Sequence, residues 1–239
     1  EVNEKKVKNS LQKSQHLVLG LEFDVLKYIG INIESYFKNF SQLTNINRYQ
    51  VFEWDDEFIL ETGKAYGGDV SLRFDYKKLN VYASYSLNWV TRNDGIIVYR
   101  THFDRRHNIN ITTSYSFGKK DAWQIDMRWN YGTGFPFTKT KGIYPRSESI
   151  TSINSNFNNN NEVLGIILDD INTGQLPDYH RLDISIKRRF VVSERVKMEL
   201  ILGVTNAYNY YNIFYVHRLT NEKIYQLPIL WSVNYNVKF

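Results

Sequence analysis

Two short runs of charged residues carry side chains that bind anions. The first covers residues 100–107, and the second, residues 178–181, lies at the same level of a later predicted strand. Arginine pairs with carboxylates and phosphates through two parallel hydrogen bonds, and histidine ligates metals, so the runs together could bind an anionic or metal-chelated ligand. The alternative is a rim of exposed charges, with each pair contributing about 0–1 kcal/mol. The candidate ligand-binding residues are Arg100, His102, Asp104, Arg105, Arg106, Asp178, His180 and Arg181, and His107 adjoins them.

The segment DDINTG, with Asp169, Asp170 and Asn172, is rich in oxygen ligands. Calcium takes about six to eight oxygens, and Gly174 would permit the tight turn of a calcium loop. The full twelve-residue pattern is missing, and no bidentate acid closes it. An ordinary polar loop is the favoured interpretation, and we expect neither a bound metal nor a cofactor.

No pattern indicates catalysis. The histidines at 16, 102, 107, 180 and 217 form no H-E-x-x-H motif, and no serine lies in a G-x-S-x-G elbow. The chain has no cysteine, which excludes disulfides, a thiolate metal site and a cysteine nucleophile. We predict that the protein is not an enzyme.

Aromatic residues occur in two settings. One group lies beside acidic residues in a long predicted loop, where it would either contact a partner or form a small loop core. The tryptophans on predicted strands are interpreted as a membrane-interface belt, because indole rings gather at the headgroup level. The loop group is Tyr49, Phe52, Trp54 and Phe58, and the strand group is Trp89, Trp123, Trp129 and Trp231.

The composition indicates an all-β chain. Its 239 residues include 18 Tyr, 14 Phe and 5 Trp but only 4 Pro. The net charge of +5 is spread along the chain, which argues against a nucleic-acid partner. No stretch approaches the roughly 18 consecutive apolar residues of a transmembrane helix.

Alternation of apolar and polar residues predicts nine strands. At the end of the chain, for example, Trp231, Val233 and Tyr235 alternate with polar residues. Each strand has about 9–14 residues, longer than the mean of about 5–6 and close to the roughly 9–11 that cross a bilayer. The predicted strands cover residues 16–28, 31–44, 66–76, 79–91, 104–118, 122–137, 179–192, 196–209 and 229–239, after a leading segment 1–13.

Short and long connections alternate along the chain. Turns are predicted at Ile29-Gly30, Lys77-Lys78, 118–121 and 193–195, and long polar loops near 45–64, 91–103, 139–178 and 210–227. Outer-membrane barrels have short periplasmic turns and long extracellular loops, so this sorting predicts a transmembrane antiparallel β-barrel. Strands one, three, five, seven and nine should then descend toward the periplasm, with the others ascending.

The polar strand faces should line the lumen of such a barrel. Charges of both signs lie there, which argues against purely anionic or cationic selectivity. They are Arg73, Asp75, Asp126, Arg128, Arg181, Asp183, Lys187, Lys197 and Glu199.

Nine strands close badly, because single-chain bacterial barrels have even strand numbers. Residues 1–13 also contain no secretory signal. We therefore expect the chain to be part of a longer protein that supplies the earlier strands.

Several motifs resemble the C-terminal barrel of TonB-dependent outer-membrane receptors of the Bacteroidetes type. Residues 103–108 (FDRRHN) resemble the family's F/Y-D-R-x-H-x segment, and residues 176–183 (LPDYHRLD) its P-x-Y-H-R-L-D segment. Residues 204–209 (VTNAYN) are similar to the close of the penultimate strand, and 66–69 (YGGD) to an earlier strand start. Gln226-Leu227-Pro228 leads into a last strand that ends on Phe239.

The resemblance implies a twenty-two-stranded barrel of which this chain supplies the last nine strands, without the N-terminal plug. It implies TonB-dependent nutrient uptake across the bacterial outer membrane, with the plug, the earlier strands and the TonB system as partners. Tyr235, Val237 and Phe239 resemble the signal read by the barrel-assembly machinery, which would act by strand addition. Phe239 would also serve as an interface anchor.

Two alternatives stay open at this point. One is a passive porin-like or surface-binding barrel without a plug. The other is a soluble secreted β-sandwich with a binding function, which also alternates apolar and polar faces. The sandwich would pack Leu200, Leu202, Tyr235 and Val237 between two sheets.

Overall fold

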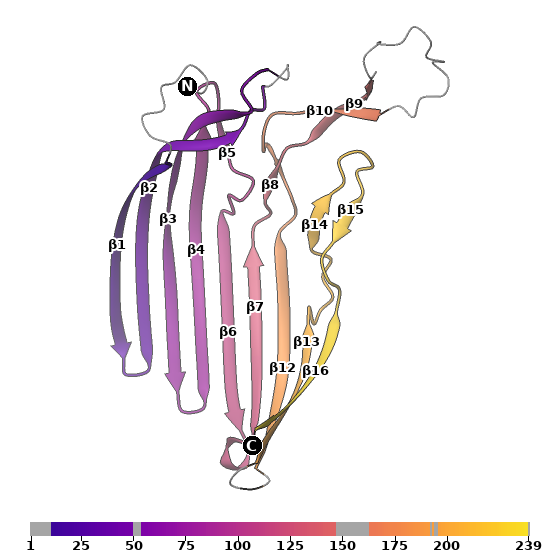
Figure 1. Ribbon diagram of the computed structural model, residues 1–239. Coiled ribbons are helices and arrows are strands. Elements are labelled where there is room, and N and C mark those ends of the chain that lie inside the picture. Colours follow the sequence, from indigo (N-terminus) through magenta and orange to yellow (C-terminus); the bar gives the residue numbers. More distant parts are fainter. Residues whose placement is uncertain (1–10, 50–53, 147–162, 192, 194–195, 239) are drawn as a thin grey trace.

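The computed structural model describes residues 11–49, 54–146, 163–191, 193 and 196–238. Nine long antiparallel strands form one curved sheet in the order β1-β2-β3-β4-β6-β7-β12-β13-β16, and the short strand β5 extends it beside β4 (Figure 1). The strands are β1 Lys13–Leu26, β2 Ile29–Ile46, β3 Phe58–Tyr76, β4 Leu79–Asn93, β5 Val98–Arg100, β6 His107–Phe117, β7 Trp123–Gly132, β12 Tyr179–Val191, β13 Lys197–Thr205 and β16 Leu230–Lys238.

Short elements occupy the connections. Within the described residues, three two-stranded pairs lie at one end of the sheet, and one 3-10 turn lies at the other. The pairs are β8 Pro136–Phe137 with β11 Gly174–Gln175, β9 Thr140–Arg146 with β10 Val163–Leu168, and β14 Ile213–Val216 with β15 Lys223–Tyr225; the turn is η1 Lys119–Asp121.

All nine long strands expected from the sequence are present, with some bounds shifted. The third strand starts at Phe58 rather than at 66, because β2 and β3 stay paired up to Ile46 and Phe58. Part of the predicted loop 45–64 is therefore strand. The first turn lies at Lys27-Tyr28, two residues before the predicted Ile29-Gly30, since Leu26 pairs with Ile29.

The predicted start of the fifth strand and the predicted end of the sixth strand were also wrong, for the same reason. Strand β6 starts at His107 and β7 ends at Gly132, so residues 104–106 and 133–137 leave the main sheet. Backbone bonds across the loops replace the ladder there: the Asn88 N–H donates to the Arg106 carbonyl at 3.0 Å, and the Thr133 N–H to the His107 carbonyl at 3.0 Å.

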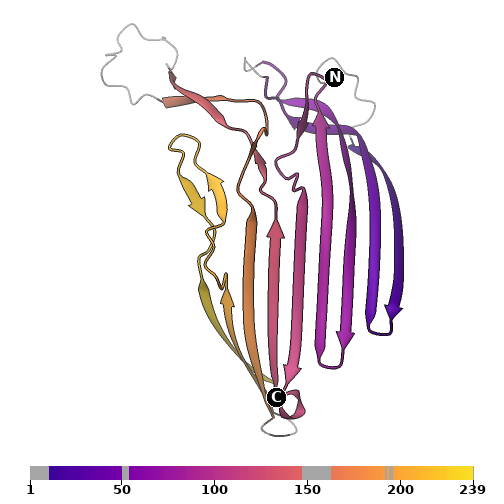
Figure 2. The ribbon, with the colours of Figure 1, turned by 180° about the vertical axis from the view of Figure 1, so that it is seen from behind.

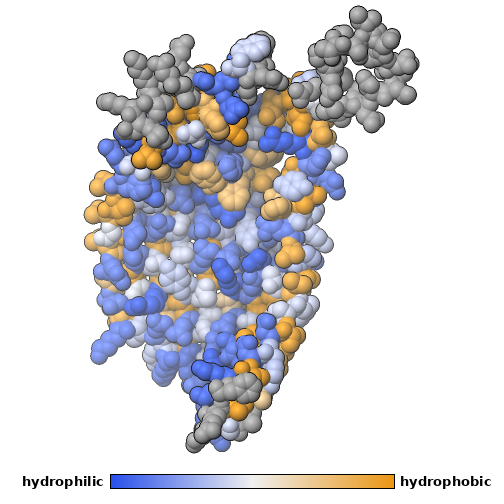
Figure 3. All heavy atoms as spheres, viewed as in Figure 1, coloured by the Kyte–Doolittle hydropathy of each residue, from blue (hydrophilic) through white to orange (hydrophobic). Residues whose placement is uncertain are grey.

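The two faces of the sheet differ in polarity. Apolar residues on the convex face are exposed: Leu202 is 45%, Tyr235 58% and Val237 37% exposed. Figure 3 looks onto the hollowed face, which is mainly hydrophilic. A single sheet with an exposed apolar face excludes the β-sandwich alternative, which required those residues to be packed between two sheets.

Aromatic side chains form two bands on the convex face. Near the loop end, Tyr66 stacks on Trp89 at 5.3 Å between ring centroids, and Trp129 stacks on Tyr131 at 6.1 Å. Near the turn end, Phe117 stacks on Trp123 at 6.2 Å, and Tyr28 contacts Phe74 and Tyr76. Two aromatic girdles around an apolar band are typical of outer-membrane barrels.

The turns and loops are sorted to opposite ends, as the sequence predicts (Figure 2). The buried residues gather at the loop end, where Ile59, Leu60 and Tyr99 pack with buried polar groups. At the lateral edges, β1 pairs with β2 alone and β16 with β13 alone within the described residues. Those residues include no helix of the length and hydropathy needed to cross a membrane.

Candidate functional site

The loop end contains a buried polar cluster, here called the crown network: Asn45, Arg48, Glu61, Arg92, Asp94 and Tyr99. It is built where β2 and β3 extend beyond β1 and β5 folds back on β4. Glu61 is only 1% exposed, although it is a carboxylate. Burying a charge is costly unless it is paired and hydrogen-bonded, so the contacts of Glu61 decide whether this arrangement is stable.

Every oxygen of Glu61 has partners. Arg48 and Arg92 form ion pairs with it, the latter at 3.3 Å. The Tyr99 hydroxyl donates to the two carboxylate oxygens at 2.8 and 2.9 Å, and the Asn45 amide at 3.2 and 3.3 Å. Burial and the neighbouring Glu61 carboxylate raise the pKa of the Tyr99 hydroxyl, which therefore stays a donor.

Asp94 closes the β4–β5 turn. Its Oδ1 accepts the N–H groups of Ile96 and Ile97 at 2.8 Å each, and its Oδ2 accepts from Arg48 at 3.1 Å. Tyr49 also donates to Oδ2 at 2.8 Å. Burial would raise the pKa of Asp94, but these donors outweigh it and hold the pKa below the usual value. The crown network is a satisfied structural unit.

Asp104 organises the predicted ligand-binding run. It is fully buried, its Oδ1 accepts the Val90 N–H at 2.9 Å, and its Oδ2 accepts from Arg100 at 2.8 Å and Arg106 at 3.2 Å. The Arg106 guanidinium also lies 4.6 Å from the Trp89 ring centroid. Three of the predicted residues are therefore occupied with one another and shape the loop 101–106.

Arg105 extends away from this cluster across the backbone of Gly132. Its guanidinium lies 4.1 Å from the Phe135 ring centroid and 5.4 Å from that of Tyr179. A Cβ at Gly132 would come within 2.6 Å of the Arg105 side chain, so an alanine there would displace that side chain. Burial lowers the pKa of Arg105, with Tyr179 and Asp178 opposing the shift, and arginine remains charged at neutral pH.

Arg105, Arg128 and Arg181 line one recess on the hollowed face, here called the arginine wall. The recess has a volume of about 340 Å³ and is completed by amides and a phenol: Asn108, Asn110, Asn130, Tyr179 and Gln226. Arg181 pairs with Asp183 at 2.9 Å. Arg105 and Arg128 have no ion pair within the described part of the chain. The wall therefore has an excess of positive charge.

Elsewhere on the hollowed face, some of the predicted lumen charges lie in ion pairs. Arg73 lies between Asp24 and Asp75, at 3.7 and 3.4 Å. Arg189 pairs with Glu199 at 3.5 Å. The mixed signs noted in the sequence are thus present on this face, with some charges in ion pairs and others, such as Lys187 and Lys197, in no ion pair within the described residues.

Asp178 and His180 are not brought to this wall. Side chains alternate across a strand, so His180 faces opposite to Arg181, on the same side as Leu182. Its Nδ1 lies 2.8 Å from the Tyr208 hydroxyl, and Asp178 accepts from Tyr131 at 2.7 Å and from the Gly134 N–H at 3.1 Å. His107 likewise bonds Tyr85 at 2.9 Å. The expectation that both runs form one cluster was wrong for these residues, because it ignored strand alternation.

His102 is also apart from the wall. Its ring contacts Phe103 edge-on at 5.0 Å between centroids. Of the eight predicted residues, the recess brings together Arg105 and Arg181 alone. The alternation of its strand predicts Arg128 on the lumen face, but nothing in the sequence groups it with Arg105 and Arg181, which lie far from it along the chain.

The segment 169–174 is tied to its neighbours. The Asn172 side-chain oxygen accepts from the Thr138 hydroxyl at 3.3 Å, and its amide donates to the Arg100 carbonyl at 2.7 Å. Asn172 has a positive φ of 55°, which asparagine tolerates. No group of three or more histidines and acids suited to a metal occurs within the described ranges.

Two other predicted features are only partly described. Tyr235 and Val237 lie on the exposed face of β16, and Tyr235 donates to the Met198 sulfur at 2.9 Å, whereas Phe239 lies outside the described residues. In the aromatic loop, Trp54 is 81% exposed and Tyr49 joins the crown network, and Phe52 lies outside the described residues.

Comparison with known proteins gives a fold but no family. No family model matches the chain, and no curated protein matches it. Solved structures match over almost its whole length. One is a complex of FpvAI with pyocin S2, which has a TM-score of 0.62 at 10% identity and covers 93% of this chain and 27% of that one.

A second match is the ferripyoverdine receptor of the outer membrane of Pseudomonas aeruginosa, bound to ferripyoverdine. Its TM-score is 0.59 at 10% identity, with 90% of this chain and 26% of that one covered. FpvA bound to heterologous pyoverdines matches with a TM-score of 0.61. The chain thus spans about a quarter of the length of these structures. Its fold is that of part of an outer-membrane receptor β-barrel.

Proposed function

We propose that this chain is the C-terminal part of the barrel of an outer-membrane receptor that takes up a nutrient in a TonB-dependent manner. The observation that carries the proposal is a receptor-type sheet with an apolar outer face and an arginine wall on its hollowed face. The motif resemblance to Bacteroidetes-type receptors supports the same function.

The aromatic bands support a position across the bilayer. On β3, Tyr66 in one band and Tyr76 in the other are ten residues apart. At about 3.3 Å per residue and a tilt of about 40°, the bands lie about 25 Å apart along the membrane normal. That is the height of the apolar band of an outer-membrane barrel.

The arginine wall supports a ligand that bears anionic groups. Guanidinium groups bind carboxylates and phosphates in pairs of charge-assisted hydrogen bonds. Arg105 is held in place by Phe135 and Tyr179. Arg128 has no ion pair to break within the described residues. Ligand binding therefore needs little reorganisation of either side chain, which lowers its free-energy cost. The function remains binding and transport rather than catalysis.

The partners in this proposal are the plug and earlier strands of the same receptor, the TonB system, the barrel-assembly machinery and the lipid bilayer. One of the similar structures is a receptor bound to ferripyoverdine, and an iron chelate that carries anionic groups would suit the wall of this chain. Uptake by the full-length protein in intact cells tests it. We expect import of a nutrient to stop on deletion of TonB or addition of a protonophore.

A passive porin makes a different prediction. Full-length protein in a planar lipid bilayer should give no stable open-channel current if a plug fills the barrel. Steady ohmic conductance, with uptake that survives the protonophore, would overturn the proposal in favour of the porin.

The wall itself is tested by Arg128→Gln. We expect uptake of an anionic nutrient to fall about tenfold, because a charge-assisted contact contributes about 1.5–3 kcal/mol. Arg73→Gln is the matched control, since Arg73 lies on the same face but is paired with Asp24 and Asp75. Equal loss in both variants would show that the wall has no special part in uptake.

A further inference from the structure

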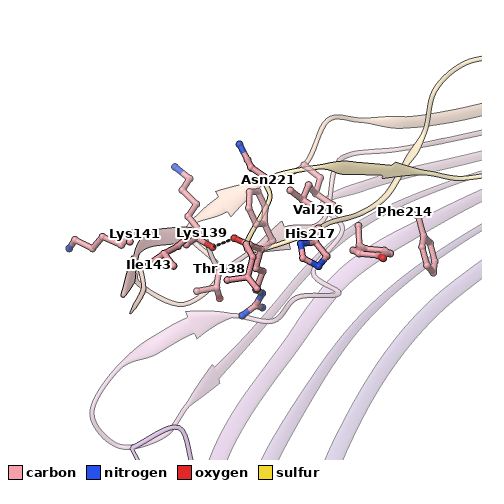
Figure 4. A pocket seen from close by; sticks show the side chains of 15 residues that line it. Thr138, Lys139, Lys141, Ile143, Phe214, Val216, His217 and Asn221 are labelled. Atoms are coloured by element: carbon pink, nitrogen blue, oxygen red, sulfur yellow. Dashed lines mark hydrogen bonds between the residues drawn. The ribbon is translucent and has the colours of Figure 1, made fainter. Parts of the chain in front are cut away.

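A groove at the loop end lies apart from the arginine wall. It runs between residues 137–143 and the β14–β15 hairpin, with Leu176 at its side, and has a volume of about 910 Å³ (Figure 4). None of the three arginines of the wall lines it. Its volume is in the range of pockets that hold small molecules, about 300–1,000 Å³.

Hydrogen bonds fix both sides of the groove. The Thr140 hydroxyl donates to the Arg218 carbonyl at 3.2 Å and so ties the two sides together. The Asp169 N–H donates to the Lys139 carbonyl at 3.0 Å, and the His217 N–H to the Glu222 carbonyl at 2.8 Å. The groove is therefore held open by structure on both sides.

Large apolar side chains line the groove and remain exposed. Phe214 is 66% exposed, Tyr215 47% and Ile143 45%. Apolar surface gathered in a concave site favours a ligand that covers it, because burial removes that surface from water. Two aromatic rings suit a flat aromatic body, which stacks on them.

The polar residues of the groove select for negative charge. Lys139, Lys141 and Arg218 line it, and no acidic residue does. His217 adds a directed donor: the Thr220 N–H lies 3.3 Å from Nδ1, which must then accept, so in the neutral ring Nε2 carries the proton. Figure 4 shows His217 between the lysine side and Phe214.

We propose that this groove binds a soluble organic anion with a flat aromatic body, its charge held by Lys139, Lys141 and Arg218 and its ring covered by Phe214 and Tyr215. The inference goes beyond the proposed uptake function, because binding here needs neither TonB nor the arginine wall. A failure of the uptake proposal would leave it standing.

The probe is 2-naphthyl phosphate, with 2-methoxynaphthalene as its neutral counterpart. Full-length protein in phosphatidylcholine nanodiscs is titrated by calorimetry, and empty nanodiscs give the background. We expect the phosphate to bind at least about tenfold more tightly than the neutral compound and its affinity to fall with added salt. Equal affinities would overturn the proposal.

Charge variants locate the site. The triple variant Lys139→Gln, Lys141→Gln, Arg218→Gln should weaken phosphate binding about tenfold or more and leave binding of the neutral compound unchanged. The control Lys77→Gln, Lys119→Gln, Lys120→Gln removes equal charge at the opposite end and should bind like wild type. Equal weakening by both variants would mean a general surface charge effect and would overturn the proposal.

Two further arms complete the test. Phe214→Ala should weaken both compounds, and heat-modifiable gel mobility confirms that each variant forms a folded barrel. Nanodiscs with phosphatidylglycerol show whether an acidic lipid headgroup occupies the groove. Loss of probe binding in those nanodiscs, beyond the effect of the same lipid on the control variant, would overturn the assignment to a soluble ligand.

Discussion

The crown network and the arginine wall both contain arginines, but they differ in how far acidic groups pair with those arginines. In the crown, Glu61 is buried among Arg48, Arg92, Tyr99 and Asn45, so one carboxylate has more donors than it needs. In the wall, three arginines share a recess in which one of them, Arg181, forms an ion pair with an acid, Asp183. The crown completes its charge within the chain, and the wall does not.

This difference separates structural from ligand-facing arginines. A buried carboxylate must be paired, and removing its partners or the carboxylate itself leaves uncompensated charge. An arginine at a hydrated recess keeps water as a partner and can exchange it for a ligand. Substitutions in the crown should therefore have large effects on stability and small effects on ligand binding. Substitutions in the wall should have small effects on stability and large effects on ligand binding.

The largest expected effect on stability is that of Glu61→Gln. It leaves Arg92 without a buried counter-ion and Arg48 with Asp94 alone, which should destabilise the loop end by about 3 kcal/mol, the low end of the usual range because both arginines keep some solvent contact. Hydrogen exchange of residues 58–62 and 90–99 measures it. Glu34→Gln, an exposed carboxylate on β2, is the control, and equal exchange in both would contradict a structural crown.

Asp104→Asn should have the next largest effect. The amide still accepts the Val90 N–H, but the charge that holds Arg100 and Arg106 is lost, so we expect about 1–3 kcal/mol of local destabilisation. Faster proteolysis within residues 101–106 would report it. Unchanged cleavage would mean that the loop does not depend on this carboxylate.

Acid should open the crown at the β4–β5 turn. The folded-state pKa of Asp94 lies below its unfolded value, so its contribution is present above about pH 4 and is lost as the pH falls through the folded value. Protection of the Ile96 and Ile97 amides should persist from pH 7 to pH 5 and decline below about pH 4. Asp94→Asn should remove this dependence, and a decline already complete at pH 6 would contradict the assignment.

Gly132→Ala tests whether the position of Arg105 in the arginine wall matters for ligand binding. A Cβ there meets the flexible Arg105 side chain rather than backbone, so Arg105 moves at a cost of about 1 kcal/mol. We expect little change in thermal stability but weaker binding of an anionic ligand at the wall. Gly142→Ala, where a Cβ makes ordinary contacts, is the control. Retained binding would show that Arg105 need not lie across Gly132.

Arg128→Gln should have the smallest effect on stability, within about 0.5 kcal/mol, because the described structure gives it no ion pair. Urea unfolding of the full-length protein measures it beside Arg92→Gln, which breaks the pair with Glu61. Destabilisation of equal size in the two variants would erase the distinction between wall and crown.

The sheet could be predicted from the sequence because alternation and loop sorting are local signals. Residues such as Val233 and Tyr235 repeat every second position, and the turns are short enough to force antiparallel neighbours. The extension of β3 to Phe58 could not, since its buried Glu61 and exposed Lys64 look like loop residues until β2, β4 and β5 are placed around them.

The site was predicted only in part for a different reason. Asp178, His180 and Arg181 are neighbours in sequence, but alternation sends Arg181 to the hollowed face and His180 to the convex one. The grouping of Arg105, Arg128 and Arg181 depends on the pairing of β7 with β12 and on the open space over Gly132. Neither is encoded by spacing along the chain.

Membrane sidedness is the most direct test of the account. The chain has no cysteine, so single cysteines report cleanly. Thr173→Cys lies at the loop end and Lys119→Cys at the turn end, whereas Asn159 in the same predicted outer loop lies outside the described residues. With an impermeant thiol reagent on intact cells, we predict that Thr173→Cys is labelled and that Lys119→Cys is labelled only after the outer membrane is permeabilised. The opposite pattern would invert the barrel and contradict a receptor whose arginine wall and groove face the cell exterior.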